Sequence, residues 1–368
     1  MRAIVLVGGE GTRLRPLTWR TPKALVPVLG RPLLEHLLLN LKQHGVDSVT
    51  LAMTARSEAI RGAFGNGEAL GIALDYAYED TPLGSGGAIA ATASTWRGAG
   101  GGVWNEAFLV VNGDIITDLD LSAMLEAHRA RGAVLSLSLH EVDDPSPFGV
   151  VDIDAEGRIH RFVEKPKRED APSHLINAGT WIFEPRLLDM LDPTTFNRVE
   201  DGLFPTLCSS GEPVYGFHQP AYWGDIGNPD ALLRVNLDMA SGRVTSPATP
   251  RLTPGPSGQD IYIHETSTIE DGARVEGPCV IGAGCIVRAG ASVARSLLWD
   301  GVTVGPEAQV RDSILATDVT VEDGARVVRS VVAHAATIPR DASLEGERVE
   351  PAEQSLSRDL SKDGAQTT

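Results

Sequence analysis

The stretch AIVLVGGEGTRLRPLT, residues 3–18, joins a short apolar run to a loop that is rich in glycine and carries two arginines. The apolar run, residues 3–7, predicts a buried strand, and it is too short for the apolar core of a signal peptide. Glycines after a buried strand let backbone N–H groups come close to a phosphate. Arg13 and Arg15 offer forked donors, and Lys23, in TPKALVPV (21–28), adds a compact positive charge, a combination that suits a triphosphate.

Simpler interpretations of this stretch fit less well. It is not a Walker A loop, because no GK[ST] closes it, and it is not a GxGxxG motif, because position 14 is leucine. A turn with solvated basic side chains would also hold glycine and arginine. Here, however, the glycines, two arginines and a lysine fall within sixteen residues directly after a strand. We therefore expect a phosphate-binding segment.

Residues 1–240 alternate strand-like and helix-like segments. This alternation predicts an α/β fold with a mostly parallel sheet, in which ligands bind beyond the carboxyl ends of the strands. Strands are expected at 3–7, 48–53, 72–77, 107–111, 133–141 and 179–183, and helices at 32–44, 85–97, 121–131 and 185–191. The Pro-rich segment 243–258 is typical of a linker.

From residue 261 the spacing of apolar residues changes to six. The step shortens to five between Val293 and Leu298, between Val310 and Leu315, and between Val327 and Val332, and turn glycines accompany the pattern. Such a repeat is typical of a hexapeptide β-helix, in which three hexads form one triangular coil. We expect a left-handed parallel β-helix over residues 259–340 with roughly four coils, and a polar, acidic tail over 341–368. The repeat residues are Ile263, Ile269, Val275, Ile281, Val287, Val293, Leu298, Val304, Val310, Leu315, Val321, Val327, Val332 and Ile338.

Composition narrows the class of protein. The formal net charge of −17 on 368 residues argues against binding to nucleic acid or to an anionic membrane surface. Residues 1–42 nevertheless carry seven Lys or Arg and two acids, net +5, which leaves −22 on the other 326 and points to a small anionic ligand near the N-terminus. No apolar run approaches the length of a membrane span. Three cysteines form neither a disulfide framework nor a metal-spaced cluster, so a reducing cytoplasm is expected.

The motif GGEGTRLRPLT followed by PKALVPV resembles the N-terminal signature of the sugar-nucleotide pyrophosphorylases, or sugar-1-phosphate nucleotidyltransferases. The motifs cover residues 1–235, and the β-helix extends the resemblance to nearly the whole chain, most closely to mannose-1-phosphate guanylyltransferase-like proteins. The resemblance implies a Rossmann-like nucleotidyltransferase domain over residues 1–242. It also implies that the nucleotide is bound by Gly8, Gly9, Gly11, Thr12 and Arg13.

Two motifs end in an exposed acid. VNGD (111–114) places Asp114 at the end of a strand, and YWGDIG (222–227) places Asp225 in a Gly-flanked loop. Carboxylate oxygens suit Mg²⁺, which usually keeps waters and substrate phosphates as further ligands. Either acid alone could equally be a cap or turn residue. The family resemblance implies that both hold one Mg²⁺.

Three further motifs resemble the sugar-phosphate site of the family. In FVEKP (162–166) the resemblance implies that Lys165 binds the sugar phosphate and Glu164 the sugar hydroxyls. Adjacent charges on an extended segment point to opposite sides, so we expect that the two side chains need not pair with each other. Asn177 in INAGTWIF (176–183) is expected to hold sugar hydroxyls. Gly149 in PFGVV (147–151) is expected to contact the sugar, although a turn glycine explains it equally well.

EDTPLGSGGA (79–88) resembles the family's nucleobase loop, in which Gly84, Ser85 and the two glycines that follow would let the backbone touch the base. Thymidylyl and uridylyl relatives tend to have Gln where this chain has Glu79. A carboxylate only accepts hydrogen bonds and guanine offers two adjacent donors, which favours GTP. The sequence Ser85-Gly86 departs from the Thr-Ala that guanylyl relatives more often show, so the base stays open.

The resemblance implies an enzyme that transfers a nucleotidyl group from an NTP to a sugar 1-phosphate and releases pyrophosphate. Arg13, Lys23 and Lys165 would be its catalytic residues, and GTP with mannose 1-phosphate is the favoured pair. Alternatives are dTTP, UTP or ATP with glucose 1-phosphate, or a regulatory homologue that binds NDP-sugar without catalysis. His264 and His334 raise the question of acyl transfer by the β-helix, but exposed histidines on a solenoid explain them better. We expect the β-helix to assemble a homo-oligomer, since its end coils expose unpaired edges.

Overall fold

The computed structural model describes residues 1–54, 58–96, 104–250, 253–254 and 260–351, and divides into two compact units. The first comprises Met1–Gly9 and Leu37–Trp223, and the second comprises Glu10–His36 and Gly224–Thr368. The break after Gly9 divides the glycine-rich loop between the units. The expected linker and tail lie partly outside the described residues, and the expected domain boundaries stay predictions.

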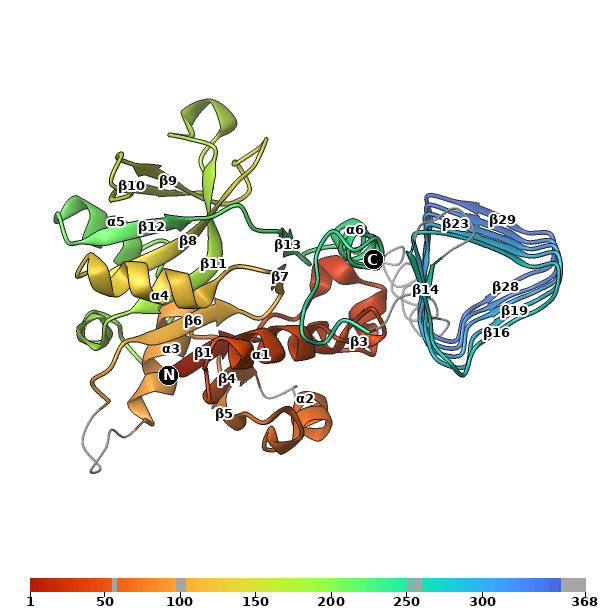
Figure 1. Cartoon of the computed structure of the whole chain (residues 1–368), viewed down its shortest axis with the longest axis horizontal. Helices are drawn as coiled ribbons and strands as arrows, with labels where there is room; N and C mark the ends of the chain where they lie inside the picture. Colours follow the sequence, from red (N-terminus) through yellow and green to blue (C-terminus); the bar gives the residue numbers. More distant parts are fainter. Residues whose placement is uncertain (55–57, 97–103, 251–252, 255–259, 352–368) are drawn as a thin grey trace, which may run out of the picture. The chain divides into compact units, whose positions relative to one another are not determined.

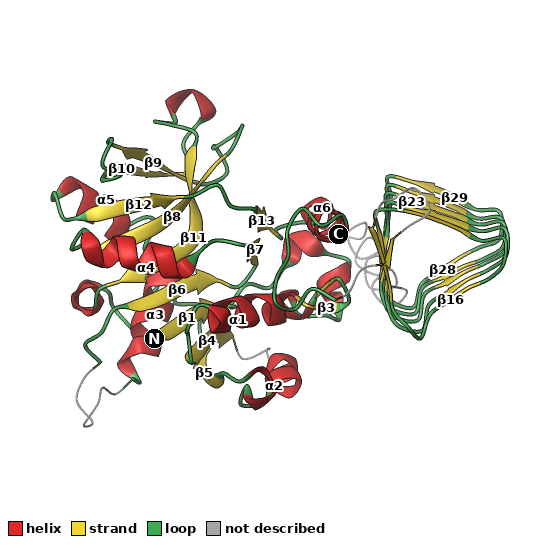
Figure 2. Cartoon of the chain, viewed as in Figure 1, coloured by secondary structure: helices red, strands yellow, loops and turns green. Residues whose placement is uncertain are grey.

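The first unit is built on one mixed, mostly parallel sheet with the strand order β10-β9-β11-β6-β1-β4-β5, and β8 pairs with β11 and β12 (Figures 1 and 2). β1 lies parallel to β4 and β6, and β4 lies parallel to β5, as the alternating pattern predicts. β11 runs antiparallel to β6 and β8. The strands of this sheet are β1 (Arg2–Leu6), β4 (Ser48–Thr54), β5 (Ala73–Glu79), β6 (Phe108–Asn112), β8 (Leu135–Glu141), β9 (Gly149–Ile153), β10 (Ile159–Glu164), β11 (Leu175–Phe183) and β12 (Val214–His218), and β7 (Ile115–Thr117) lies outside it.

Helices pack on this sheet around an aromatic core. α3 contacts β1, β4 and β5, α4 contacts β8 and β12, and α5 contacts β10. Phe108, Trp181, Phe183 and Phe204 are fully buried between these layers, where their apolar area stabilises the fold. The helices are α1 (Leu33–Gln43), α2 (Glu58–Phe64), α3 (Gly84–Ser94), α4 (Leu121–Ala130) and α5 (Leu203–Ser209).

The sequence predictions differ from the structure in two ways. The segment expected as a helix at 185–191 is a 3₁₀ helix, Pro185–Met190, which ends where Leu191 becomes extended. The strands β9, β10 and β12 and the helices α2, α5 and α6 were not predicted. All of them except α6 are short, so local pattern did not separate them from loops, whereas α6 was missed although Asn228 and Pro229 carry a helix-start signal.

The second unit contains the signature segment, residues 10–36, which has little regular structure. It forms three short 3₁₀ helices (Thr12–Leu14, Leu17–Trp19, Lys23–Leu25) and the two-residue strands β2 (Pro27–Val28) and β3 (Arg31–Pro32). α6 (Pro229–Ala240) lies beside it, capped by Asn228, whose side chain accepts from the Ala231 N–H. The Asn236 side-chain oxygen of α6 accepts from the Leu29 N–H at 2.9 Å. Partners outside the segment therefore supply part of its hydrogen bonding.

The C-terminal strands form a left-handed parallel β-helix, which confirms the expected fold. Its strands stack into three faces of a prism (Figure 1), and the apolar repeat residues from Ile281 to Ile338 are buried between them. Five coils are present rather than the expected four, because Leu344 and Val349 continue the repeat and pack on the core beyond residue 340.

The first face is β15 (Asp260–Ile263), β18 (Cys279–Ile281), β21 (Leu297–Leu298), β24 (Ile314–Leu315), β27 (Val331–Val332) and β30 (Arg348–Val349), with β14 (Thr253–Pro254) antiparallel to β15. The second is β16 (Thr268–Ile269), β19 (Ile286–Val287), β22 (Thr303–Val304), β25 (Thr320–Val321) and β28 (Thr337–Ile338). The third is β17 (Arg274–Glu276), β20 (Ser292–Ala294), β23 (Gln309–Arg311), β26 (Arg326–Val328) and β29 (Ser343–Glu345).

A column of serines explains the five-residue steps of the repeat. Ser296, Ser313 and Ser330 are buried at the corner where each step occurs, and each hydroxyl donates to a carbonyl two residues earlier in its own coil. The same oxygens accept the N–H of the residue at that corner in the next coil, at 3.1–3.2 Å. The residue before each serine has a left-handed backbone, with φ of 45–49°. A corner with a five-residue step has one residue fewer than a corner with a six-residue step. The serine hydroxyl and the N–H of the next coil nevertheless remain hydrogen-bonded there.

Candidate active site

A cavity of about 270 Å³ in the first unit collects five of the predicted nucleotide residues. It opens where β1 and β5 end and α3 begins, at the carboxyl edge of parallel strands. The predicted residues that line it are Gly8, Gly9, Glu79, Gly84 and Ser85. The remaining lining residues are Leu6, Ala52, Pro82, Ala88 and Phe196, which are all apolar. The arrangement suits a planar, partly apolar ligand group with a few polar contacts.

Two of these residues, Glu79 and Gly84, also stabilise the conformation of the loop between β5 and α3. One carboxylate oxygen of Glu79 accepts from the Leu83 N–H at 3.0 Å. Gly84 has φ of 71°, and a Cβ there would lie 2.5 Å from the carbonyl oxygen of Asn197. Glycine is therefore required at 84 by backbone conformation and by protein packing.

Residues 192–201 form a wall of the loop that the sequence analysis missed. The Asn197 N–H donates to the Leu83 carbonyl at 2.9 Å, and its own carbonyl accepts from the Gly86 N–H at 2.9 Å and from the Gly87 N–H at 3.4 Å. The Gly86 and Gly87 amides, expected to touch a base, are thus engaged by the protein. The contact joins backbone groups about 110 residues apart, so no local motif could signal it.

The Ser85 hydroxyl is also hydrogen-bonded within the protein. It donates to Glu200 at 2.6 Å and accepts from the Val199 N–H at 3.0 Å. Glu200 lies 3.7 Å from the guanidinium of Arg198, which donates to Glu164 at 3.0 Å. A chain of polar contacts therefore connects the predicted base loop to the predicted sugar motif.

In the sugar motif, one expectation about charge pairing was wrong. Lys165 and Glu164 do pair, with Nζ and Oε1 3.3 Å apart, because Lys165 is not extended but has φ of 46°. The Lys165 N–H donates to the Phe148 carbonyl at 2.9 Å, which holds this bend. Gly149 is paired with Glu164 across β9 and β10, and a Cβ there would lie 3.0 Å from a Glu164 carboxylate oxygen. The structure thus brings these three residues together.

Asn177 lies on β11 with its side-chain oxygen already bonded. This oxygen accepts from the Trp181 indole N–H at 2.7 Å and from the Gly179 N–H at 3.1 Å. Gly179 has φ of 78°, and a Cβ there would come within 2.7 Å of the Asn112 side chain. Any contact of Asn177 with a sugar hydroxyl would therefore be made by its amide N–H groups.

Asp114 lies in the turn that follows β6. The Gly113 N–H donates to the Leu6 carbonyl at 3.0 Å, and a Cβ on Gly113 would lie 2.4 Å from a Val7 methyl group. The glycine of VNGD thus lets this turn approach the end of β1. Asp114 is thereby held at the carboxyl edge of the sheet, directly after the strand next to β1.

The second unit holds the remaining predicted residues: Gly11, Thr12, Arg13, Lys23 and Asp225. Gly11 has φ of 62°, and the Thr18 hydroxyl donates to its carbonyl at 2.7 Å. A Cβ on Gly11 would lie 3.2 Å from Cβ of Lys23, so the loop and the lysine are packed together. Thr12 and Arg13 are exposed on this loop. Arg15 is turned onto its own segment, 3.9 Å from the centre of the Trp19 ring.

Arg13 and Asp225 flank the same glycine. A Cβ on Gly227 would lie 3.3 Å from Nη2 of Arg13 and 3.4 Å from both carboxylate oxygens of Asp225. The carboxylate predicted to bind a cation and the guanidinium predicted to bind phosphate are therefore neighbours.

The carboxylates of Asp114 and Asp225 are the hard oxygen donors that a divalent cation prefers. Among the residues that the structure describes, no group of three or more His, Cys, Asp or Glu side chains could hold a metal ion. A metal held by either aspartate would need substrate phosphates and water as further ligands, which suits a phosphoryl-transfer site.

The signature segment is held by the β-helix. His334 is 8% exposed, and its Nε2 lies 3.0 Å from the Leu17 carbonyl, to which it donates, and 3.3 Å from the Thr21 hydroxyl. The Trp19 indole N–H donates to Glu350 at 2.6 Å. Burial lowers the pKa of His334, which favours its neutral form. His264 is half-buried and bonds to Thr266. The expectation of two exposed histidines is therefore wrong: His334 is a packing residue, because its ring contacts Leu17 and Thr21.

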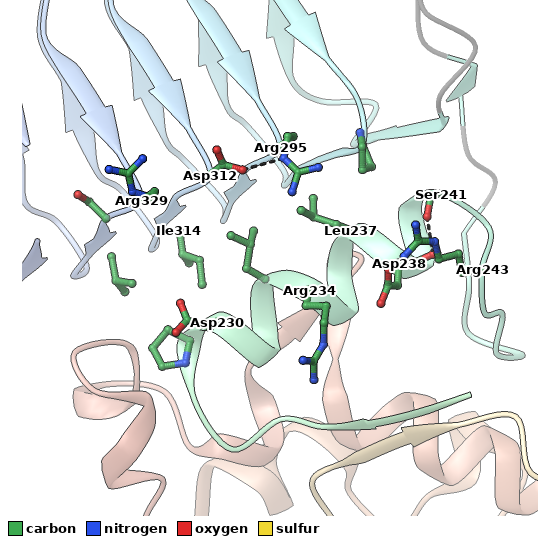
Figure 3. Close-up of a pocket in the computed structure, with 15 residues that line it drawn as sticks. Asp230, Arg234, Leu237, Asp238, Ser241, Arg243, Arg295, Asp312, Ile314 and Arg329 are labelled. Atoms are coloured by element: carbon green, nitrogen blue, oxygen red, sulfur yellow. Dashed lines mark hydrogen bonds and ion pairs between the residues drawn. The ribbon is translucent and has the colours of Figure 1, made fainter. Parts of the chain in front are cut away.

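A larger cavity of about 610 Å³ lies in the second unit between α6 and the coils (Figure 3). No predicted site residue lines it. Its charged side chains are largely paired: Arg295 with Asp312 at 2.7 Å, Arg243 with Asp238 at 2.8 Å, and Arg329 with Glu345. Its charges are therefore largely compensated, and the smaller cavity is the better candidate.

Residues 2–242 match the family model described as nucleotidyl transferase, and residues 258–364 match the model described as GMPPB C-terminal domain. The chain is 37% identical over 303 residues to a mannose-1-phosphate guanylyltransferase of Mycobacterium tuberculosis, covering 82% of this chain and 80% of the relative. It is 36% identical over 314 residues to mannose-1-phosphate guanylyltransferase 1 of Arabidopsis thaliana, covering 84% of each. A UTP–glucose-1-phosphate uridylyltransferase of Synechocystis is 31% identical over 339 residues, covering 85% of this chain and 86% of the relative.

The crystal structure of HddC from Yersinia pseudotuberculosis is similar to 64% of this chain and to 97% of its own, with 27% identity and a TM-score of 0.54. A second structure of HddC, complexed with GMP-PN, has a TM-score of 0.53 at the same identity and coverage. Among the residues described here, no helix combines the length and apolar character needed to cross a membrane.

Replacing His334 tests whether the β-helix holds the signature segment. His334→Ala removes the donor to the Leu17 carbonyl, so amides of residues 11–25 are expected to exchange hydrogen faster than in the wild type. Hydrogen exchange followed by mass spectrometry measures this. His264→Ala, which changes a half-buried histidine of the same domain, is the matched control. Unchanged exchange in His334→Ala would show that the contact does not hold the segment.

Proposed function

Because the chain belongs to the nucleotidyl transferase family, we propose that it transfers a guanylyl group from GTP to mannose 1-phosphate and releases pyrophosphate. The observation that carries the proposal is the cavity that unites Gly8, Gly9, Glu79, Gly84 and Ser85 at the carboxyl edge of the sheet. A Cβ at Gly9 would meet no described atom within 4 Å, so the described protein does not require this glycine. Close approach of a phosphate gives it a role.

The reaction needs no protein nucleophile. A phosphate oxygen of the sugar 1-phosphate attacks the α-phosphorus of GTP, the new P–O bond forms, and the bond to the β-phosphate bridging oxygen breaks. Pyrophosphate leaves with the electron pair of that bond. The protein contributes positioning and charge stabilisation.

Three cationic residues supply this stabilisation. Arg13 and Lys23, on the segment packed around Gly11, bind the triphosphate and offset the charge that develops on pyrophosphate. Lys165 holds the attacking phosphate. Its neighbour Glu164 accepts from Arg198 as well as pairing with Lys165, so it is fixed in place to accept sugar hydroxyls, with Gly149 and Asn177 beside the same ligand.

Enzymes of this family generally use a divalent metal, and we assign Mg²⁺ to Asp114 and Asp225. When bound, the metal supplies charge compensation to the phosphates. The neighbouring positions of Arg13 and Asp225 support a shared role at the triphosphate.

Guanine specificity rests on Glu79. One of its oxygens is bonded to the Leu83 N–H, which fixes the carboxylate at the wall of the cavity. The carboxylate can then accept from N1–H and the 2-amino group of guanine. Two guanylyltransferase relatives at 36–37% identity support GTP with mannose 1-phosphate as the substrate pair. The uridylyltransferase relative at 31% identity supports the competing pair, UTP with glucose 1-phosphate.

An assay of pyrophosphate release with four NTPs and with mannose and glucose 1-phosphates tests the proposal. The highest kcat/KM is expected for GTP with mannose 1-phosphate. Preference for UTP or dTTP would overturn the base assignment, and no turnover with any pair would favour a regulatory homologue.

Glu79→Gln isolates the contribution of the carboxylate. The amide oxygen can still accept from Leu83, while the amide N–H₂ would face donors of guanine. We expect kcat/KM for GTP to fall by about 5- to 150-fold, since one donor is left unpaired. Some UTP or dTTP use is expected in exchange. Equal GTP kinetics in the variant would show that Glu79 does not contact the base.

Asp114→Asn and Asp225→Asn test the metal assignment. Each change removes a charged ligand at nearly constant size, so turnover is expected to fall at least about 100-fold, with the melting temperature nearly unchanged. Turnover close to the wild-type value at saturating Mg²⁺ would exclude the altered residue as a ligand.

We also propose that the protein forms a homo-oligomer through the β-helix, in the reducing cytoplasm. The strand edges expected to be unpaired at the ends of the coil stack support assembly. The three cysteines, which are all unbridged, fit a reducing compartment. Light scattering of the full chain would detect the oligomer, and a monomer would rule it out.

A further inference from the structure

Phe196 lies at the cavity of the candidate site with its ring in solvent. Three large apolar side chains of the described residues are recorded as exposed: Phe196 at 66%, Met190 at 50% and Tyr78 at 44%. Phe196 is the one that lines the cavity together with Glu79, Gly84 and Ser85. An aromatic ring that lines a pocket and remains open to solvent is available to contact a bound ligand.

The backbone around Phe196 is firmly held. Asn197 makes backbone bonds with Leu83 and Gly86 at 2.9 Å each, and its side-chain N–H₂ donates to the carbonyls of Asp192 and Thr195. A Cβ on Gly86 would lie 2.0 Å from the Asn197 side-chain oxygen, so the contact is also close-packed. The ring is thus exposed although its backbone is anchored to the predicted base loop.

We propose that Phe196 stacks on the nucleobase of the bound NTP and is a determinant of nucleotide affinity. The proposal rests on the proposed function for the presence of a nucleotide. A stacked base presents its edge, not its face, to the surrounding wall, and Glu79 lies in that wall. The apolar lining from Leu6, Ala52 and Pro82 suits the rest of a planar ring. Phe196 therefore contacts the face of the base, and Glu79 its edge.

Stacking on an aromatic side chain tolerates different bases, because every base has a π face. Phe196 is thus assigned to affinity and Glu79 to the choice of base. If Phe196 sets affinity and Glu79 sets the choice of base, substitutions at the two positions should change different quantities. Loss of the ring should weaken every accepted NTP, whereas the change at Glu79 should alter the preference between NTPs.

Calorimetric titration of the full chain with GTP and Mg²⁺ tests the stacking. Phe196→Ala is expected to weaken binding about 5- to 100-fold, and Phe196→Tyr to bind within about 2-fold of the wild type. Phe196→Leu keeps apolar bulk without the ring and should resemble Phe196→Ala. Met190→Ala, which removes another exposed apolar side chain, is the matched control and should bind normally. The melting temperatures without nucleotide should be equal, which separates binding from folding.

Kinetics supply the second measurement. Phe196→Ala should raise the KM for GTP by a similar factor while leaving the KM for the sugar 1-phosphate unchanged. Wild-type affinity in Phe196→Ala, or equal affinities for the Leu and Tyr variants, would overturn stacking. If the wild type binds GTP but turns over no sugar phosphate, the proposed function fails while the titration still decides on Phe196. If it prefers another NTP, the titration is made with that nucleotide.

Discussion

The signature segment, residues 10–36, has too little regular structure to hold its own shape, and this constraint governs the second unit. Its backbone groups are bonded by side chains from elsewhere: the Leu17 carbonyl by His334 and the Leu29 amide by Asn236. Within the segment, Thr18 bonds Gly11. Because unpaired buried groups are costly, these bonds favour one loop conformation. The β-helix is therefore a support for the residues that we assign to the triphosphate, as well as a repeat domain.

The glycines of the two loops serve different purposes. Gly84 and Gly86 are required because Asn197 packs where a Cβ would be, whereas the space beside Gly9 holds no described atom. A sequence motif cannot separate a glycine needed by the protein from one needed by a ligand, since both appear as the same letter. The structure distinguishes these two kinds of glycine. Because the Gly86 and Gly87 amides are bonded to Asn197, Glu79 and Phe196 are the better candidates for contacts with the base.

Regular spacing made most of the fold predictable. The parallel strands around β1 and the buried repeat from Ile281 to Ile338 follow from local pattern. The family motifs named five residues that line one cavity of the first unit, and further residues that lie in the second unit. Contacts between distant backbone groups were not predictable, and residues 192–201 are the clearest case. The Lys165–Glu164 pair was wrongly expected to point apart, because a left-handed residue after a strand leaves no signal in the sequence.

The serine column has a consequence for how the β-helix can change in length. Ser296, Ser313 and Ser330 each bond to their own coil and to the next, at positions seventeen residues apart. A loss of one or two residues would misalign every later rung, whereas removal of a whole coil would rejoin identical bonding partners. Along this column of serines the β-helix can therefore grow or shrink only by complete turns, whereas the turn before it, in which Arg274 pairs with Ser292, is one residue longer. Relatives with longer or shorter solenoids can therefore share one corner chemistry.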